Sequence, residues 1–183
     1  RGHRPRLQPE PHVERAALKE SRYFDKHFDE GSEWYRSHFP PPRWKDGRRS
    51  ITGEASTKYL LYPRVPERIA KVVPQARLIV LLRNPVDRAY SHYHHWVRTL
   101  RETRRFEEAI EAELEWLLAK EEEAPEHELL ANVGRRPFSY LERSIYVDQL
   151  LRWSRFYGEQ QMLLLKSEDF FEHPTETLKR VTN

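Results

Sequence analysis

The sequence predicts an α/β fold: three layers, with a mainly parallel sheet flanked by helices. The first observation is the continuous aliphatic run RLIVLL, residues 77–82. A run of this length is typical of a strand buried on both faces of a parallel sheet. The second observation is the similar run QQMLLLK, residues 160–166. The third is the series of helical patterns between the two runs, because strands that alternate with helices indicate parallel crossover connections.

The elements before the first run are short. Residues 1–18 are rich in Arg and Pro and are expected to be irregular. Four elements are expected to follow in order: a short helix within residues 29–39, a turn with Pro and Asp-Gly at 40–49, a short strand at 50–56, and a helix at 65–74 that ends at Pro74.

The helix after the first run has a clear start. Asn84 is a suitable N-cap, Pro85 suits the first helical position, and Asp87 lies near the positive end of the helix. An apolar stripe at helical spacing indicates the face that packs inward. Its members are Val86, Ala89, Tyr90, Tyr93, Val97 and Leu100.

The C-terminal half continues the alternation. Its expected elements are an amphipathic helix at 106–120 with Ile110, Leu114, Leu117 and Leu118 inward, a solvated acidic loop at 120–128, a long helix at 140–157, the strand at 160–166, and a last helix from Pro174. No internal repeat is present.

Bulk properties set limits on the function. A length of 183 residues predicts a single domain over 1–183. The chain has no cysteine, which excludes disulfides, thiolate metal sites and a cysteine nucleophile. Its net charge of +3 permits an anionic ligand without requiring nucleic acid. No apolar run approaches the ~20 residues that a membrane helix needs.

Arg83 and Ser91 are the first candidate site residues. Arg83 follows the buried strand, and a helix N-terminus next to it offers backbone N–H groups and a positive dipole end to an anion. Ser91 lies seven positions after Asn84 and therefore on the same side of the helix. The stretch suits a phosphate clamp. An arginine that pairs with a neighbouring carboxylate is the equal alternative on physical grounds.

The stretch LLRNPVDRAYSHY resembles the 3′-phosphate-binding motif of sulfotransferases that use 3′-phosphoadenosine 5′-phosphosulfate (PAPS). The resemblance implies that Arg83 and Ser91 hold the 3′-phosphate of the nucleotide. It also implies the P-loop NTPase-like fold of that family, with PAPS as co-substrate and no metal.

KESRYFD, residues 19–25, resembles a segment of heparan sulfate and related carbohydrate sulfotransferases. The match implies that Glu20 is the catalytic base and that Arg22 and Asp25 contact the substrate. GEASTKYL, residues 53–60, resembles a second segment, in which Ala55 replaces the lysine of the family and Lys58 is a candidate substrate-binding residue.

RSIYVDQLLRWSRFYGEQQMLLLKSEDF, residues 143–170, resembles a third segment. It implies that Tyr146 binds the nucleotide, and Ser144 stands where the family has glycine. The histidines His92, His94 and His95 do not share one helix face, so a metal site is not expected.

The phosphosulfate-binding loop of the family, K-x-G-T-T/S, is not found in this sequence. We therefore expect a fragment of a longer protein that lacks the first strand, this loop and the C-terminal closing segment, and that is inactive alone.

The predicted function is sulfuryl transfer from PAPS to a hydroxyl or amine, with a carbohydrate or other small molecule as the acceptor. The alternatives are a P-loop-type nucleotide phosphotransferase or kinase, and a non-catalytic nucleotide-binding relative. A nucleic-acid-binding module is disfavoured because acidic residues are interleaved with the basic ones. The composition favours a bacterial cytoplasmic protein over one of the Golgi lumen.

Overall fold

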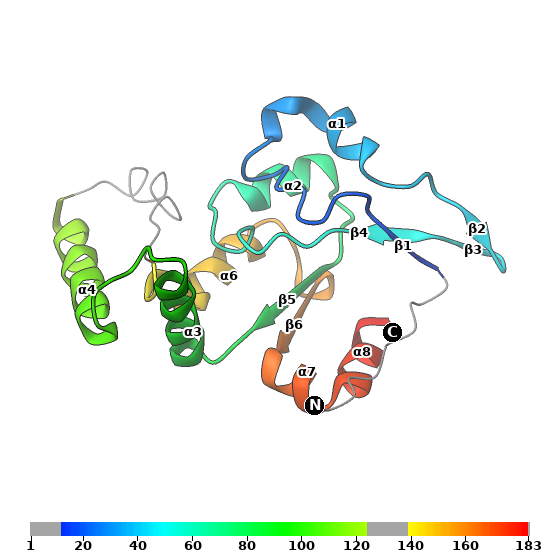
Figure 1. Ribbon diagram of the computed structural model, residues 1–183. Coiled ribbons are helices and arrows are strands. Elements are labelled where there is room, and N and C mark those ends of the chain that lie inside the picture. The colour runs from blue at the N-terminus through cyan, green and yellow to red at the C-terminus, as the bar shows by residue number, and fades with distance from the viewer. Residues whose placement is uncertain (1–11, 124–138, 183) are drawn as a thin grey trace. The chain divides into compact units, whose positions relative to one another are not determined.

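The computed structural model describes residues 12–123 and 139–182 (Figure 1). The chain forms two compact units: unit 1, residues 1–57, and unit 2, residues 58–183. The single domain expected over residues 1–183 stays a prediction. No described helix combines the length and the apolar character needed to cross a membrane.

The described part of unit 1 contains short strands, the 3-10 helix Phe28–Glu30 and one α-helix. Its elements are β1 (Val13–Arg15), α1 (Gly31–Ser37), β2 (Trp44–Lys45), β3 (Arg48–Arg49) and β4 (Ile51–Gly53). β1 and β4 pair in parallel, and β2 and β3 form an antiparallel hairpin. The core is aromatic: Tyr23 and Phe24 are 1% exposed, and the Tyr23 and Tyr35 rings stack with centroids 4.7 Å apart.

Unit 2 contains the parallel strand pair that the sequence predicts. Its elements are α2 (Val65–Val72), β5 (Leu78–Leu82), α3 (Pro85–Arg98), α4 (Phe106–Glu123), α6 (Tyr146–Ser154), β6 (Met162–Lys166), α7 (Ser167–Glu172) and α8 (Pro174–Thr182). β5 pairs with β6 in parallel from Leu78↔Met162 to Leu82↔Lys166. Figure 1 shows the two strands side by side, with β5 running into α3. The predicted α/β class is confirmed.

Two groups of buried side chains support unit 2. Val65 and Ile69 on α2 are buried, as are Trp153 and Tyr157 on and after α6. Trp153 Nε1 donates to the carbonyl of Leu60 at 3.2 Å, which satisfies its polar atom. The second group contains Ala89, Ala109 and Tyr140, and Tyr93, Trp96 and Ile110 pack against it. Burying each large side chain contributes roughly 1.5–3 kcal/mol.

The prediction that the first aliphatic strand is buried on both faces is wrong. Ile79 and Leu81 are 55% and 50% exposed, and they alternate with half-buried neighbours. Among the described residues β5 pairs only with β6, and the alternation shows that one face of this pair is covered. Period-two burial of this kind is usual for a sheet that faces solvent on one side.

Three helices differ from their predicted form. In α3 the predicted inward residues Val86 and Tyr90 are exposed, and Leu100, also exposed, lies beyond the end of the helix. α6 begins at Tyr146, and Tyr140, placed at the start of this helix by the sequence, is fully buried outside it. In α4 the predicted inward residues Leu114 and Leu118 are exposed, whereas Ala109 and Glu113 are buried. A carboxylate thus occupies part of the inward face. The expected acidic loop at 120–128 lies largely outside the described residues.

Candidate functional site

The turn between β5 and α3 is formed as the sequence predicts. The Asn84 side chain accepts hydrogen bonds from the backbone N–H groups of Val86 at 2.9 Å and Asp87 at 3.3 Å. Pro85 follows at the first helical position, where its missing N–H costs no hydrogen bond. The helix therefore starts immediately after the strand, and Arg83 is fixed at the junction.

The backbone N–H groups at this helix start are not free for an anion. Asn84 N donates to Glu168 Oε1 at 2.8 Å, and the next two N–H groups are capped by Asn84. The hydrogen bond from Asn84, and to a smaller extent the Arg83 charge, lower the pKa of the Glu168 carboxyl. The N–H groups that were expected to bind an anion are thus occupied, and the neighbouring side chains are the groups that remain for this role.

Arg83 and Ser91 supply such side chains. Both are exposed, Arg83 at the end of β5 and Ser91 in the second turn of α3. Among the described residues no salt bridge involves Arg83, because the nearby Glu168 carboxylate accepts from Asn84 N and Ser167 Oγ instead. The alternative of a strand-end arginine paired with a carboxylate is therefore disfavoured. A guanidinium fork and a hydroxyl suit a phosphate group.

Residues 139–146, which we call the strap, contact the turn between β5 and α3. Tyr146 Oη donates to the carbonyl oxygen of Arg83 at 3.1 Å. Ser144 Oγ lies 3.1 Å from the carbonyl oxygen of Pro85 and accepts from Arg88 Nε at 2.7 Å. Arg88 also donates to the carbonyl of Tyr140. The serine that replaces the family's glycine thus links strap, turn and helix.

Glu113 on α4 holds the start of the strap. Its carboxylate accepts from the backbone N–H groups of Tyr140 at 2.5 Å, Leu141 at 3.0 Å and Glu142 at 3.1 Å. Tyr140 Oη donates to Glu102, and burial, followed by this hydrogen bond, raises the pKa of Tyr140. Sequence reasoning missed Glu113. The available signal was a glutamate four positions after Ala109, on the inward face of an amphipathic helix.

Replacing Ser144 by alanine is expected to destabilise the fold by about 1–3 kcal/mol, because the half-buried Arg88 Nε–H loses its acceptor. Urea unfolding measures the change. Ser154→Ala is the control, since Ser154 is exposed and its hydroxyl donates to the carbonyl of Leu151 within its own helix. Equal stability of the two variants would contradict the role given to Ser144.

Glu20 lies in a loop of unit 1 with unusual backbone geometry. Glu20 and Arg22 both have φ of 53°. This left-handed region is uncommon for residues other than glycine and costs of order 1–3 kcal/mol per residue. Such strain persists only where surrounding contacts impose it, and it occurs most often at functional sites.

The contacts that impose this geometry come from the segment after β4. Ser21 is 3% exposed, and its hydroxyl donates to the Glu54 carboxylate. The backbone N–H of Arg22 donates to Ser56 Oγ at 3.3 Å. Two consecutive residues of the loop are thus fixed to residues 54–56, and Glu20 is presented beside them with its side chain half-buried.

The three predicted substrate-binding residues are placed differently. Arg22 donates to Asp25 Oδ2 with Nη2 at 2.6 Å and Nε at 3.1 Å, so the pair is bidentate on the arginine side. The Asp25 side chain is 1% exposed and its contact is with Arg22, whose own side chain is 32% exposed. Asp25 therefore orients Arg22, and acceptor binding stays a prediction for Arg22, Asp25 and Lys58. Lys58 belongs to unit 2.

Ser21→Ala is expected to release the strained loop. Loss of a buried hydroxyl that bonds a carboxylate should cost about 1–3 kcal/mol of unfolding free energy. Hydrogen exchange of residues 19–25 should accelerate. Ser37→Ala is the control, because Ser37 is an exposed serine of the same unit whose hydroxyl donates to the carbonyl of Trp34 within α1. Unchanged exchange in Ser21→Ala would show that the Glu54 bond does not hold the loop.

No group of His, Asp and Glu side chains that could hold a metal exists among the residues that the structure describes. His92 Nε2 is 2.7 Å from Trp96 Nε1, which donates to it. Burial, and then the nearby charges of Arg143 and Arg88, lower the pKa of His92 to about 4. His92 is therefore a neutral packing residue. The expectation of metal-free chemistry stays a prediction.

Curated proteins similar to this chain are sulfotransferases. Human heparan sulfate glucosamine 3-O-sulfotransferases 3B1 and 3A1 are each 30% identical over 181 residues, which is 96% of this chain and 40% and 38% of theirs. The membrane-associated sulfotransferase kil1 of Dictyostelium discoideum is 35% identical over 95 residues, covering 52% of this chain and 20% of kil1. The chain thus spans about 40% of the length of the first relatives.

These relatives correct the predicted location. The expectation of a bacterial cytoplasmic protein is wrong as stated, because the relatives are eukaryotic proteins and include one named as membrane-associated. A bacterial likeness also exists: the crystal structure of a sulfotransferase from Alicyclobacillus acidocaldarius matches with a TM-score of 0.71 at 28% identity, over 94% of this chain and 70% of that chain. Composition therefore does not assign a compartment.

The family model described as "Sulfotransferase domain" matches residues 60–183. The matched residues contain Arg83, Ser91 and Tyr146, together with the strap that supports the turn. The sequence motifs, the parallel pairing of β5 with β6, the similar sequences and the similar solved structure all indicate the same family. The chain belongs to the sulfotransferase family.

Proposed function

We propose that the protein transfers a sulfuryl group from PAPS to a hydroxyl or amine of a carbohydrate. The observation that carries the proposal is the β5–α3 junction, where an exposed Arg83 without a salt bridge among the described residues precedes the exposed Ser91 on the next helix. The two side chains fit the 3′-phosphate that distinguishes PAPS from ATP. Tyr146 fixes the Arg83 backbone and is the third residue assigned to nucleotide binding.

Glu20 is assigned the role of general base. As the acceptor forms its new bond to sulfur, Glu20 takes the proton that the acceptor loses, and the bond between sulfur and the 5′-phosphate oxygen breaks. The product nucleotide is 3′,5′-ADP. The reaction resembles phosphoryl transfer in its need for in-line positioning and for stabilisation of negative charge. Arg22 and Asp25 are the residues of this loop assigned to the acceptor, and Asp25 also holds Arg22.

The carbohydrate acceptor is supported by relatives named as heparan sulfate sulfotransferases. One of them, from Caenorhabditis elegans, is a bifunctional heparan sulfate N-deacetylase/N-sulfotransferase that is 27% identical over 168 residues. Names of both O- and N-sulfotransferases thus occur among the relatives. Both hydroxyl and amine acceptors therefore belong in the proposal.

The test is a transfer assay with the full-length protein, PAPS or ATP as donor, and a panel of acidic and neutral oligosaccharides. We expect a sulfated product with PAPS and no phosphorylated product with ATP. Phosphate transfer from ATP would replace the proposal with a phosphotransferase. Binding of 3′,5′-ADP without transfer to any acceptor would leave a nucleotide-binding relative that has lost catalysis.

A further inference from the structure

The β2–β3 hairpin of unit 1 presents an exposed tryptophan, Trp44. The hairpin turns at Asp46 and Gly47, whose φ values are 50° and 73°. Positive φ at both positions is the type I′ geometry that fits the twist of a two-residue hairpin. The neck is closed by hydrogen bonds from Ser50 N to Arg43 O at 2.7 Å and from Arg43 N to Ser50 Oγ at 2.8 Å.

Trp44, on β2 of this hairpin, is 74% exposed. Tryptophan is buried on average in folded proteins, and an exposed one is more informative than an exposed leucine because tryptophan dominates binding energy at interfaces. Its cross-strand partner is Arg49. Directly opposed residues of an antiparallel pair project on the same face of the ribbon, so an aromatic ring and a guanidinium share this face.

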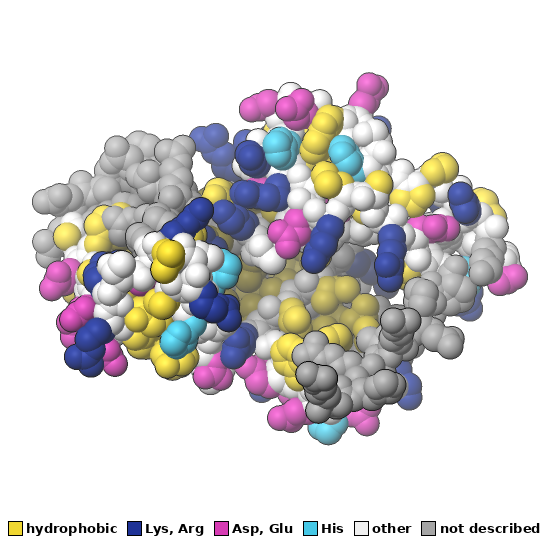
Figure 2. Space-filling view, in the orientation of Figure 1, with side chains coloured by type: hydrophobic (Ala, Val, Ile, Leu, Met, Phe, Trp, Pro, Cys, Tyr) yellow, Lys and Arg dark blue, Asp and Glu magenta, His cyan; other side chains and the backbone are white. Residues whose placement is uncertain are grey.

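The charge around Trp44 is positive. Arg43, Arg48 and Arg49 are exposed, and none forms a salt bridge with a carboxylate of the described residues. Asp46 at the turn is the acidic residue of the hairpin. Figure 2 shows hydrophobic and basic side chains next to one another over β2 and β3. The surface therefore attracts a partner that carries negative charge.

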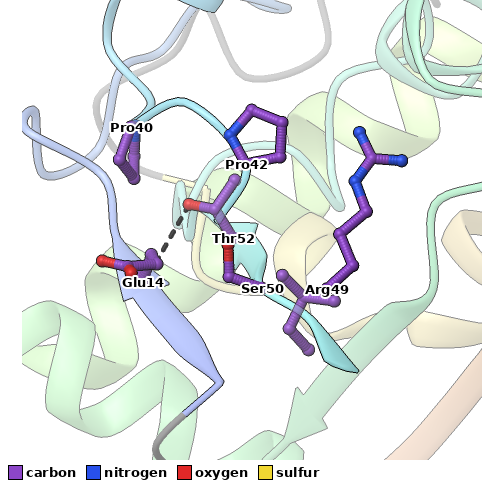
Figure 3. Close-up of a pocket in the computed structure, with 7 residues that line it drawn as sticks. Glu14, Pro40, Pro42, Arg49, Ser50 and Thr52 are labelled. Atoms are coloured by element: carbon purple, nitrogen blue, oxygen red, sulfur yellow. Dashed lines mark hydrogen bonds between the residues drawn. The ribbon is translucent and has the colours of Figure 1, made fainter. Parts of the chain in front are cut away.

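A shallow open pocket of ≈ 300 Å³ adjoins the base of the hairpin. Its lining residues are Glu14, Pro40, Pro42, Arg49, Ser50, Ile51 and Thr52. Figure 3 draws the two proline rings along one side, with Arg49 and Glu14 on opposite sides. The pocket thus places proline ring surfaces beside the Arg49 guanidinium, with the Glu14 carboxylate on the opposite side.

We propose that this hairpin, residues 43–49, is a docking surface for an acidic carbohydrate chain. An aromatic face packs on the C–H face of a sugar ring, and arginine forks bind carboxylate or sulfate oxygens in bidentate form. A ligand that uses both the aromatic face and the arginines needs a sugar ring and a negative charge. An acidic sugar has both, whereas a neutral sugar or a simple anion has one of the two. The inference rests on the proposed function, and it names the class of acceptor and the surface that holds it.

The experiment compares the full-length protein with Trp44→Ala and Arg49→Ala. Calorimetry with a heparin-derived oligosaccharide measures docking, and transfer kinetics measure the KM of the acidic acceptor. Each variant should weaken oligosaccharide binding about tenfold or more. The acceptor KM should rise, while kcat and the KM for PAPS stay unchanged. Arg36→Ala removes an exposed arginine of α1 in the same unit and should bind like the parent.

Three outcomes would overturn the inference. The first is unchanged heparin affinity in both variants. The second is equal binding of a neutral dextran oligosaccharide, since charge would then play no part. The third is tighter, Trp44-dependent binding of single-stranded DNA. Trp44 and Arg49 are exposed, so loss of folding is not expected, and thermal unfolding checks this. Absence of any sulfated product from the parent protein refutes the proposed function instead.

Discussion

Glu20→Gln is expected to lower kcat for sulfuryl transfer about 10²–10⁴-fold, because the amide cannot accept the proton that the acceptor loses. Glutamine is nearly isosteric with glutamate, so the strained loop keeps its bonds from Ser21 to Glu54 and from Arg22 to Ser56. Affinity for 3′,5′-ADP should therefore be unchanged. Single-turnover kinetics with saturating PAPS measure the chemical step.

The matched control is Glu33→Gln, which removes an exposed carboxylate of α1 in the same unit. It should leave the rate unchanged. A rate for Glu20→Gln within threefold of the parent, with normal folding, would remove Glu20 from the mechanism.

Arg83→Ala is expected to weaken 3′,5′-ADP binding about 10- to 100-fold, because a hydrogen-bonded charged group contributes about 1.5–3 kcal/mol. The exposed side chain forms no salt bridge among the described residues, so its removal leaves no buried carboxylate without a partner. Binding of 5′-AMP, which has no 3′-phosphate, should change little. Calorimetric titration of both nucleotides measures the two effects.

Arg77→Ala is the control for Arg83→Ala. Arg77 is also exposed, and it precedes the opposite end of the same strand, β5. If only the loss of one positive charge mattered, both variants would weaken 3′,5′-ADP binding to the same extent. If Arg77→Ala weakens 3′,5′-ADP as strongly as Arg83→Ala does, the effect is long-range attraction and Arg83 does not contact the 3′-phosphate.

The β5–α3 junction was predictable because its signals are local. An aliphatic run, an N-cap asparagine and a proline at the first helical position lie within nine consecutive residues, 78–86, and the structure confirms all three. The short helix α1 and the end of α2 before Pro74 follow from equally local patterns. The family resemblance rests on this stretch in combination with three others, residues 19–25, 53–60 and 143–170.

The supports of the site were not predictable because they join residues far apart in the chain. Tyr146 and Arg83 are 63 positions apart, and Ser144 and Arg88 are 56 apart. Local sequence patterns, such as hydrophobic spacing and capping residues, do not indicate which distant residues form a hydrogen bond. The use of the helix N–H groups by Asn84 and Glu168 was hidden for the same reason, since Glu168 lies 84 positions from Asn84.

Helix faces were predicted less well than helix positions. On α6 the apolar Val147 and Leu151 are exposed, whereas the polar Gln149 is buried together with Trp153. Gln149 is inside because its amide donates to the carbonyls of Glu142 and Ile145. A polar side chain with local hydrogen-bond partners can be buried at low cost, which a hydropathy pattern does not register. The positive φ of Glu20 and Arg22 is equally invisible, since nothing but glycine signals it.

The measurement that tests the central claim most directly is calorimetric titration of the full-length protein with 3′,5′-ADP and with 5′-AMP. The two nucleotides differ only in the 3′-phosphate that Arg83 and Ser91 are assigned to hold. We expect 3′,5′-ADP to bind at least tenfold more tightly, which corresponds to about 1.4 kcal/mol from the 3′-phosphate. Equal affinity for the two nucleotides would contradict the assignment of Arg83 and Ser91 and, with it, the use of PAPS.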